Sequence, residues 1–468
     1  MLSPYALSRG DRYGRLFPLS DAEFDLSDLR TLGLSMRSNV SRIPFARRSP
    51  PPPAGYTYAG QFVLHDLTRD DTALPRAAEQ AACDTANGNQ PRLDLSSLYG
   101  AGPCSQDRHL YEDDRASLKL GEVRTKRGTF FDLPLDPKTS RPLLADSRNN
   151  ENLILRQIHA MFLKLHNRAV VDLRGEVLES KLFEEASRRV RWQFQWLVRF
   201  DYLPRICKPS VYRDVVLTGH RQIDWPRGSF SIPLEFSHAA ARFGHSMVRS
   251  KYDLNHDSLD VALTEMIRQV HKPGALEPSL AVDWRKFFTS REPANSIDTT
   301  MAEPMFELPI EALRRFGTTV SDDNPAELAV RTLRRGAVMK LPSGQQVRDA
   351  LSPGSAISDV HAEFPSYEPF KILVDLGLEE RTPLWYYILL EAEVNERGAR
   401  LGEVGSRLIA EVIEGALEAD PTSIAHQLKR NPKWRPPAWK TARGESVNVD
   451  SFLDLAFVVG LTDAPSAS

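Results

Sequence analysis

Two histidines and one arginine in this chain have types and neighbours that suit a shared chemical site. His65 lies in an apolar, helix-like segment, Arg148 lies in a polar segment further along, and His245 closes the sequence Arg-Phe-Gly-His. A histidine exchanges protons near neutral pH, and its neutral ring can also coordinate a metal. Arginine stays protonated, so it can stabilise negative charge without joining the proton transfer. The three residues predict a site at which one histidine moves protons, the arginine stabilises an anion and the other histidine binds iron.

His65 is the candidate acid–base residue. Cleavage of a peroxide O–O bond needs a base that takes a proton from one oxygen and returns it to the other. Gln61 precedes His65 by four residues, so both side chains share one face of a helix, and we expect the Gln61 amide to contact a water or ligand there. Arg148 is the candidate for stabilising the departing hydroxide. The alternative for Arg148 is a surface ion pair with Asp146 or Glu151.

His245 is the candidate iron ligand, because a neutral imidazole nitrogen is a common axial ligand of haem iron. The apolar pattern predicts a helix over residues 235–249 that carries it. His238 lies seven residues earlier, near the same face, and is the competing candidate.

A short polar loop has the composition of a calcium site. Its alternating residues would point to one side of an extended chain. Calcium takes several oxygen ligands, among them carboxylates, hydroxyls and backbone carbonyls. Asp66, next to His65, could complete such a shell, while the alternative is an ordinary turn. The alternating residues are Gln90, Arg92, Asp94 and Ser96.

Helical periodicity dominates and strand-like alternation is scarce, so the sequence predicts a mainly α fold with little β-structure. The clearest helix follows Arg148, with Asp146 and Ser147 as candidate caps. Its apolar stripe consists of Leu155, Ile158, Phe162, Leu165 and Ala169. Further helices are expected over residues 184–200, 326–334, 383–395 and 404–417.

The candidate site residues must meet in space, which predicts one domain over residues 55–461. Residues 1–54 are predicted to form an irregular arm across the surface, because the prolines at 50–53 cannot be helical. A polyproline ligand for a partner is the alternative for this segment. Residues 462–468 are small and polar, which predicts disorder.

Composition narrows the function classes. The 468 residues are 41% hydrophobic and 26% charged, which allows a substantial core. The 60 basic and 62 acidic residues give no support to a nucleic-acid partner. No apolar run approaches the ~20 residues that span a bilayer, no secretory signal pattern is visible, and the three cysteines form no CxxC pair. A cytoplasmic location is expected by default, with a secreted mature chain as the alternative, and nothing indicates the oligomeric state.

Together these segments resemble the animal-type haem peroxidase family, which has bacterial members. The family pattern Gly-Gln, three residues, His-Asp is matched at residues 60–66. The pattern Val-Asp-x-Ser-x-x-Tyr-Gly is similar to residues 93–100. Ala-Gly-Asp-x-Arg-x-x-Glu is similar to residues 145–151, followed by His-Asn-Arg at 166–168, and Arg-Phe-Gly-His is matched at 242–245. The resemblance covers about residues 55–350.

The resemblance implies haem b and Ca²⁺ as cofactors, with hydrogen peroxide and a small electron donor as partners. It makes His65 the distal acid–base residue, Arg148 the distal arginine and His245 the iron ligand. Gln90 stands where the family usually has threonine. By the resemblance, calcium would be held by Asp66, Asp94, Ser96 and the carbonyl of Arg92.

The distal side departs from the family at one of two ester-forming positions. Mammalian members bond haem through an aspartate next to the distal histidine, and here Leu64 occupies that position, so this link is absent. Glu151 matches the second ester-forming carboxylate. It is expected either to form one ester link to the haem or to form an ion pair with Arg148 or a neighbouring basic group.

The proximal side departs from the family at Thr332, which stands where an asparagine accepts a hydrogen bond from the proximal imidazole. Threonine is shorter, so we expect less imidazolate character at His245. Arg335 keeps its family position and is expected to pair with a haem propionate. Arg242, in the proximal motif, is also assigned to the haem site.

The resemblance implies a peroxidase that reduces hydrogen peroxide or an organic hydroperoxide and oxidises a small reductant or halide through a ferryl intermediate. A fatty-acid dioxygenase of the cyclooxygenase-like branch is the first alternative. That chemistry uses a tyrosine three residues before the proximal histidine, where this chain has Arg242. A haem-binding protein without turnover is the second alternative, which the pair His65 and Arg148 speaks against.

Overall fold

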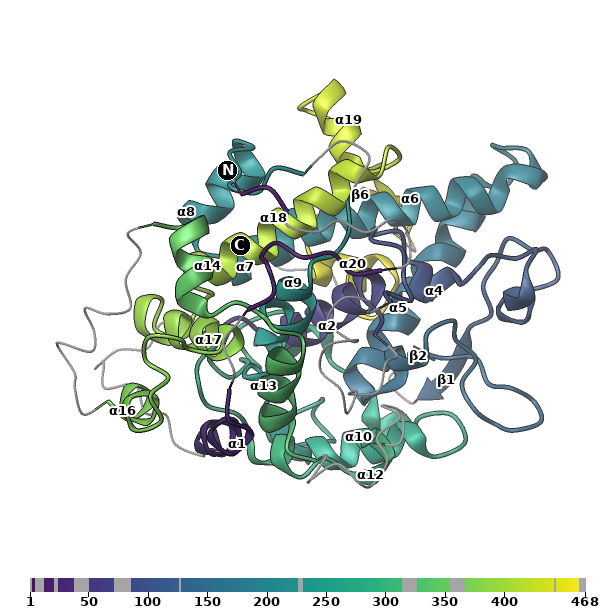
Figure 1. The fold of residues 1–468 in the computed structure, drawn as a ribbon. Helices are drawn as coiled ribbons and strands as arrows, with labels where there is room; N and C mark the ends of the chain where they lie inside the picture. Colours follow the sequence, from purple (N-terminus) through teal and green to yellow (C-terminus); the bar gives the residue numbers. More distant parts are fainter. Residues whose placement is uncertain are drawn as a thin grey trace.

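The structure, a computed structural model, describes residues 2–4, 12–20, 24–37, 50–70, 86–125, 128–225, 230–313, 326–353, 367–441 and 443–462. Within these residues the chain is mainly helical, as the sequence predicts (Figure 1). The described strands form two-stranded antiparallel sheets. They pair β1 (Gly121–Thr125) with β2 (Gly128–Asp132), β3 (Lys251–Tyr252) with β4 (Val261–Ala262), and β5 (Trp439–Lys440) with β6 (Ser446–Val447). None of the described helices combines the length and the apolar character that a bilayer-spanning helix needs.

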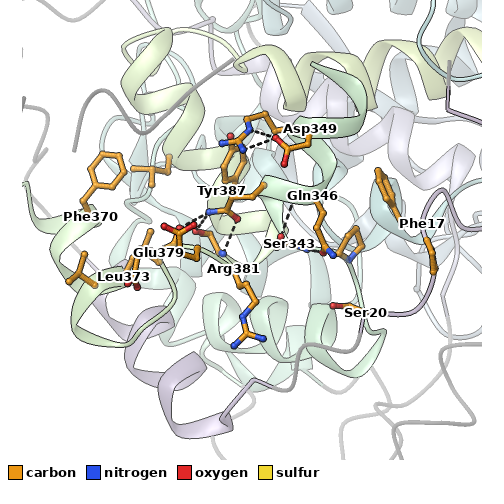
Figure 2. A pocket seen from close by; sticks show the side chains of 18 of the residues that line it. Phe17, Ser20, Ser343, Gln346, Asp349, Phe370, Leu373, Glu379, Arg381 and Tyr387 are labelled. Atoms are coloured by element: carbon orange, nitrogen blue, oxygen red, sulfur yellow. Dashed lines mark hydrogen bonds and ion pairs between the residues drawn. The ribbon is translucent and has the colours of Figure 1, made fainter. Parts of the chain in front are cut away.

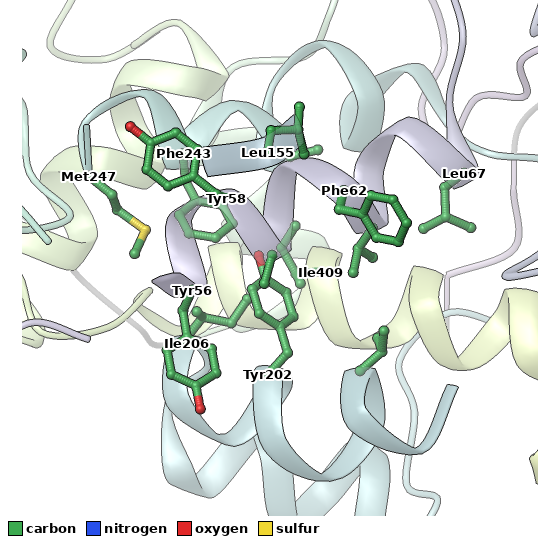
Figure 3. Close-up of a cluster of buried hydrophobic side chains, with 14 of the residues drawn as sticks. Tyr56, Tyr58, Phe62, Leu67, Leu155, Tyr202, Ile206, Phe243, Met247 and Ile409 are labelled. Carbon is green, nitrogen blue, oxygen red and sulfur yellow. The ribbon is translucent and has the colours of Figure 1, made fainter. Parts of the chain in front are cut away.

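Helix α2 (Gly55–Leu67) lies in the middle of the fold, with buried residues on nearly every side (Figures 1 and 3). The ring of Phe62 stacks on Phe162 of α5 (Leu153–Leu173), with centroids 5.0 Å apart. Gly60 allows a close approach to Tyr202, because a Cβ atom there would lie 2.3 Å from the tyrosine hydroxyl. This packing fixes the position of the helix that carries Gln61 and His65.

Helix α5 confirms the predicted apolar stripe, since the stripe residues are all buried. Its N-cap is Asn152, whose side chain accepts a hydrogen bond from the Leu155 amide. Asp146 caps a different element, the short helix η2 (Ser147–Asn150), by accepting from the Arg148 amide. The predicted caps Asp146 and Ser147 were therefore wrong for α5, because an extra turn separates them from its start.

The helix predicted over residues 235–249 is wrong, since two short helices replace it. Helix α9 (Leu234–His238) is followed by Ala239 as its C-cap, and η6 (Ala240–His245) then forms a tighter 3₁₀ helix. Ala239 has φ −131° and ψ −75°, outside the helical region. The side chain of Arg242 donates to the Ser237 carbonyl, which a continuous α-helix would pair with a backbone amide. This break places His245 at the end of a short, rigid turn.

The expected irregular arm is partly ordered. Helix α1 (Leu26–Ser35) buries Leu29 and Leu32 and packs on α13 (Leu328–Val338). Residues 12–20 are largely buried as well. The prediction of an irregular surface arm is therefore wrong for these parts, because apolar side chains spaced within residues 26–35 and residues 13–17 join the core. Residues 463–468, predicted to be disordered, lie outside the described residues.

The remaining helices complete the core around α2 and α5. The predicted helices over 184–200, 326–334, 383–395 and 404–417 correspond to α6 (Leu182–Leu197), α13, α17 (Leu384–Asn395) and α18 (Glu403–Ala419). The other elements are α4 (Ser96–Tyr99), η1 (Gln106–Leu110), η3 (Glu179–Lys181), η4 (Val198–Tyr202), α7 (Leu203–Ile206), α8 (Pro209–Tyr212), η5 (Arg213–Leu217), α10 (Leu263–His271), η7 (Pro278–Leu280), α11 (Trp284–Phe287), η8 (Glu303–Phe306), α12 (Ile310–Leu313), α14 (Gly344–Leu351), α16 (Glu368–Asp375), α19 (Ile424–Arg430) and α20 (Phe452–Val458).

Candidate active site

His65, on the last turns of α2, is held by a buried asparagine. Its Nδ1 atom lies 3.0 Å from Asn149 Oδ1, and Asn149 Nδ2 lies 3.0 Å from His159 Nδ1. Burial lowers the pKa of His159 to about 4, so this histidine is neutral and its Nδ1 accepts from the amide. The Asn149 oxygen then faces His65 and accepts its Nδ1 hydrogen. In the neutral ring this contact places the hydrogen on Nδ1 and the proton-accepting lone pair on Nε2.

The Nε2 side of His65 faces Glu151 and Gln61. Glu151 Oε2 lies 3.8 Å from His65 Nε2, and the Gln61 amide donates to the same oxygen at 2.9 Å. The side-chain amide of Asn152 in turn donates to the side-chain oxygen of Gln61 at 3.1 Å. The structure thus brings together Gln61, His65 and Glu151 as the sequence predicts. The Gln61 amide contacts Glu151 directly, which the sequence did not predict.

Arg148 lies against the C-terminal end of α2. Its Nη2 donates to the His65 carbonyl at 2.7 Å, and its Nη1 donates to the Thr68 carbonyl at 2.6 Å. Nε and Nη2 also form a two-point ion pair with Asp146, with Nη2 2.6 Å from Oδ2. The ion pair with Asp146 was the alternative interpretation, but it is largely buried rather than exposed. Arg148 therefore both anchors the His65 backbone and places a positive charge beside it.

The loop after α2 supports the same helix end, which sequence reasoning missed. Asn89 donates to the carbonyls of His65 and Asp66, and Asn87 donates to that of Leu67. These carbonyls end a helix and have no partner within it. The asparagines at 87 and 89 carry the signal, because asparagine commonly bonds to nearby backbone groups in turns. Residue spacing did not predict that these two asparagines contact the end of α2, because about twenty residues separate them from it.

His245, the candidate iron ligand, has a buried Nδ1 atom with no hydrogen-bond partner. Burial, together with the charges of Arg242 and Arg331, lowers the pKa of His245 to about 3, so the ring is neutral and able to coordinate a metal. The Trp385 ring lies edge-on to it with centroids 6.2 Å apart, and Trp385 donates to the Arg242 carbonyl. Helix α17 therefore fixes the turn that carries His245.

The competing histidine is already bonded at both ring nitrogens. His238 Nε2 lies 2.9 Å from Asp70 Oδ2, and its Nδ1 lies 2.6 Å from the Ser237 hydroxyl. Thr332 donates its hydroxyl to the Leu328 carbonyl of its own helix at 2.9 Å. The threonine therefore does not serve the Nδ1 atom of His245, in line with the expectation that its side chain is too short.

A cluster of basic side chains lies near the proximal histidine. Arg335 pairs with Asp70, as does His238, so Asp70 takes the contact that the sequence assigned to a haem propionate. Arg242 is partly buried, and its desolvation together with the charge of Arg335 lowers its pKa to about 10. Charges of one sign buried side by side are unfavourable without an anion. This cluster, which includes Arg331, therefore favours binding of a negatively charged group.

The candidate calcium loop brings two acidic residues together. Asp66 accepts from the amides of Leu95 and Ser97 at 2.8 and 3.1 Å, and Asp94 accepts from that of Ser96 at 2.9 Å. Burial and the neighbouring Asp94 raise the pKa of Asp66 to about 8. The Ser96 hydroxyl is buried without a hydrogen-bond partner. One buried carboxylate, one partly buried carboxylate and an unpartnered hydroxyl fit a hard cation such as calcium.

The loop differs from the extended geometry expected of it. Leu95 has φ +59°, so the chain turns sharply between Asp94 and Ser96. Gln90 and Arg92 are exposed, and the Gln90 carbonyl accepts from the Arg92 amide. The prediction that alternating side chains point to one side is therefore wrong, and Gln90 does not join the buried carboxylates.

A cavity of about 960 Å³ opens elsewhere, between residues 17–20 and helices α14, α16 and α17 (Figure 2). Phe17, Phe370, Arg381 and Tyr387 are among its lining residues. A second, much smaller space borders His238, Thr332 and Trp385. Neither is lined by His65 or His245. The two histidine-bearing elements are nevertheless neighbours, because η6 contacts α2 directly.

Residues 50–311 match the family model for the animal haem peroxidase, which is more than half of the chain. The chain therefore belongs to the animal haem peroxidase family, and the resemblance inferred from its motifs is confirmed. Family membership implies haem as the cofactor and an enzyme of the oxidoreductase class.

Curated relatives share a part of their length with this chain. Peroxidase mlt-7 of Caenorhabditis elegans is 28% identical over 174 residues, 36% of this chain and 23% of the relative. Thyroid peroxidase of Mus musculus is 27% identical over 179 residues, 35% and 19% of the two chains. Chorion peroxidase of Drosophila melanogaster is 26% identical over 286 residues, 57% and 32% of the two. The matched region thus spans at most about a third of each of these proteins.

Solved structures share the fold over nearly the whole chain. Peroxidase A from Dictyostelium discoideum has a TM-score of 0.62 at 16% identity, covering 98% of this chain and 93% of that one. A fatty acid alpha-dioxygenase of Oryza sativa has a TM-score of 0.62 at 14% identity, covering 92% and 78%. At these identities the likeness concerns the fold.

The residues present fit a haem group. The neutral imidazole of His245, whose Nδ1 atom is buried, suits an axial ligand, and the basic cluster around Arg242 and Arg335 suits the two carboxylates of a haem edge. His65, on a neighbouring element, has its ring held by the Asn149 contact at Nδ1. These observations are independent of one another, and each matches a different part of the cofactor.

Proposed function

We propose that this chain reduces hydrogen peroxide or an organic hydroperoxide and oxidises a small reductant or halide, at a haem b held by His245. The observation that supports this most strongly is the fixed ring of His65, whose Nδ1 hydrogen is bound by Asn149 and whose Nε2 carries the proton-accepting lone pair. When bound, the haem supplies the iron that takes up the oxidising equivalents of the peroxide.

The protein's own residues would handle the protons and the charge. His65 Nε2 takes the proton from the bound peroxide oxygen and returns it to the departing oxygen, which leaves as water. Asn149 holds the ring in the required tautomer throughout. The charge of Arg148 lies beside the His65 backbone and stabilises negative charge as the O–O bond breaks. Gln61 and Glu151 keep the Nε2 side polar.

Glu151 is the remaining candidate for one ester link to the haem. Its carboxylate faces the Nε2 atom of His65, and Arg148 forms its two-point ion pair with Asp146. Extraction of haem from the protein with acidified solvent separates a bound ester from a non-covalent haem.

A fatty-acid dioxygenase is the second candidate, because solved dioxygenases share the fold. The side chain three residues before His245 is Arg242, which lies near other basic groups and cannot form the radical that a tyrosine forms. We therefore expect the haem-loaded protein to oxidise phenols or halides with hydrogen peroxide and to consume no oxygen with palmitate. Oxygen uptake with palmitate and no peroxide turnover would reverse this choice.

Asn149 is a positioning residue for this reaction. Asn149→Ala removes the acceptor for His65 Nδ1, so we expect the peroxide reaction to slow by roughly 10- to 100-fold, as for other residues that orient a reactive side chain. Asn149→Asp keeps an acceptor and should be faster than the alanine variant. Stopped-flow absorbance gives the rate constants. Asn150→Ala is the matched control, because Asn150 is equally buried but bonds to the Val270 carbonyl.

We also propose that Asp66, Asp94 and Ser96 hold Ca²⁺. Calcium bound only to the folded state should raise the free energy of unfolding by about 2.7 kcal/mol at a free concentration 100 times its Kd. Thermal unfolding with added calcium or with a chelator measures this effect. The Asp94→Asn variant should lose most of the response. An unfolding temperature of the parent protein that changes neither with calcium nor with the chelator would argue against the site.

A further inference from the structure

Tyr13 lies in a buried segment that precedes the region matched by the family model. Gly14 bonds through its backbone to Ile232 and Leu234, just before α9. The carboxylate of Glu235 accepts hydrogen bonds from the next two backbone amides, those of Leu16 and Phe17, at 3.1 Å each. The segment is therefore fastened to the proximal half of the candidate site.

Arg15 fastens the same segment to a second element. Its Nη1 donates to the Met339 carbonyl at 2.8 Å, and its Nη2 donates to the Lys340 carbonyl at 2.7 Å. These carbonyls follow α13, the helix that carries Arg335. These contacts hold the four residues that follow Tyr13 and thereby restrict where its side chain points.

The Tyr13 side chain points into the basic cluster. Its ring lies edge-on to His238, with centroids 5.5 Å apart, and the residue is 8% exposed. Its hydroxyl is buried and has no hydrogen-bond partner. A buried hydroxyl without a partner is unfavourable, so this hydroxyl is a candidate donor to a bound molecule.

The charges around Tyr13 identify the kind of acceptor. Arg148 from the distal side, and Arg242 and Arg335 from the proximal side, all lie within electrostatic range of Tyr13, with Asp70 as the acidic group. Asp146 pairs with Arg148, so the proximal arginines and Asp70 set the local charge. The excess is positive, which favours an anionic acceptor. Tyr13 thus stands where the distal and proximal halves of the site meet, with a local charge that favours a carboxylate.

We propose that Tyr13 donates a hydrogen bond to a propionate carboxylate of the haem, and that residues 12–20 thereby form part of the cofactor site and slow haem release. This inference rests on the proposed haem site and adds a residue from outside the family match. Tyr13 is a binding residue here, since the chemistry of peroxide cleavage does not pass through it.

The test compares Tyr13→Phe with the parent protein in two haem-loaded forms. One form carries haem b, and the other carries haem dimethyl ester, whose propionates are methylated and uncharged. Transfer of haem to excess apomyoglobin, followed by absorbance, gives the release rate. With haem b, Tyr13→Phe should release haem roughly tenfold faster, as expected for loss of one hydrogen bond to a charged group. With the dimethyl ester, the two proteins should release haem at similar rates.

Two further measurements keep the test decisive. The haem-free Tyr13→Phe protein should unfold at the same temperature as the parent or higher, because the variant lacks the unpartnered hydroxyl. Tyr212→Phe is the control, since Tyr212 is a half-buried tyrosine that bonds to the Arg199 carbonyl. Equal release rates with haem b, or the same acceleration with both haems, would overturn the proposal. Failure of the parent protein to bind haem would instead overturn the proposed function.

Discussion

Replacing His65 with alanine is expected to slow the reaction with hydrogen peroxide by roughly 10²–10⁴-fold, the range for loss of a positioned acid–base group. The haem should stay bound, because His65 is not the proposed iron ligand. The physical reason is that the Asn149 contact at Nδ1 places the proton-accepting lone pair of the neutral His65 ring on Nε2. Stopped-flow absorbance of the haem-loaded protein measures the rate constant directly.

His220→Ala is the control for this variant, because His220 is an exposed histidine that lies beside Asp214. It should react at the parent rate. Haem content of each protein is measured in parallel, so that a slow reaction is not confused with cofactor loss. A His65→Ala protein that reacts with peroxide as fast as the parent would remove the acid–base role from this residue.

Replacing His245 with alanine is expected to have the largest effect on the cofactor. The variant should lose most of its haem or the absorbance spectrum of a histidine-ligated haem, because His245 is the neutral imidazole left without a hydrogen-bond partner at Nδ1. Added imidazole should restore part of the spectrum by filling the vacated ligand position. Absorbance spectra of the ferric and ferrous proteins provide the measurement.

His238→Ala separates the two histidine candidates. Both ring nitrogens of His238 have partners in Asp70 and Ser237, so its loss should leave the ligand spectrum in place. A normal spectrum for His245→Ala together with a lost spectrum for His238→Ala would transfer the ligand role to His238. The two variants therefore give opposite results under the two assignments.

The buried face of a helix was predictable from the sequence where its apolar pattern was strong. The stripe of α5 repeats at three and four residues, so its burial followed from the sequence alone. The break between α9 and η6 was not predictable, because it depends on Arg242 bonding to the Ser237 carbonyl. Similarly, the buried segment around Tyr13 is held by Glu235, more than two hundred residues away in the chain.

In the candidate site, too, some contacts were predictable from the sequence and others were not. Gln61 and His65 share one helix face, and Glu151 sits on the short turn that also carries Arg148, so spacing was enough to associate them. Asn149 escaped notice because asparagine beside an arginine has no distinctive pattern. Its role depends on His159, which belongs to α5 and reaches Asn149 only after that helix has packed on α2.

The candidate calcium loop illustrates a residue pattern whose predicted geometry was wrong. Alternation predicted an extended loop, yet the left-handed turn at Leu95 brings Asp94 and Asp66 together by a different route. The residue types carried the information about oxygen ligands. The backbone path depended on hydrogen bonds to Asp66, which lies on another element.

The central claim is that a haem lies between the imidazoles of His65 and His245. The measurement that tests it most directly is the absorbance spectrum of the haem-loaded protein, recorded before and within milliseconds of mixing with one equivalent of hydrogen peroxide. We expect the spectrum of a histidine-ligated ferric haem that changes at once on mixing and returns when a phenol is added. A protein that takes up no haem, or whose haem spectrum does not change with peroxide, would contradict the account.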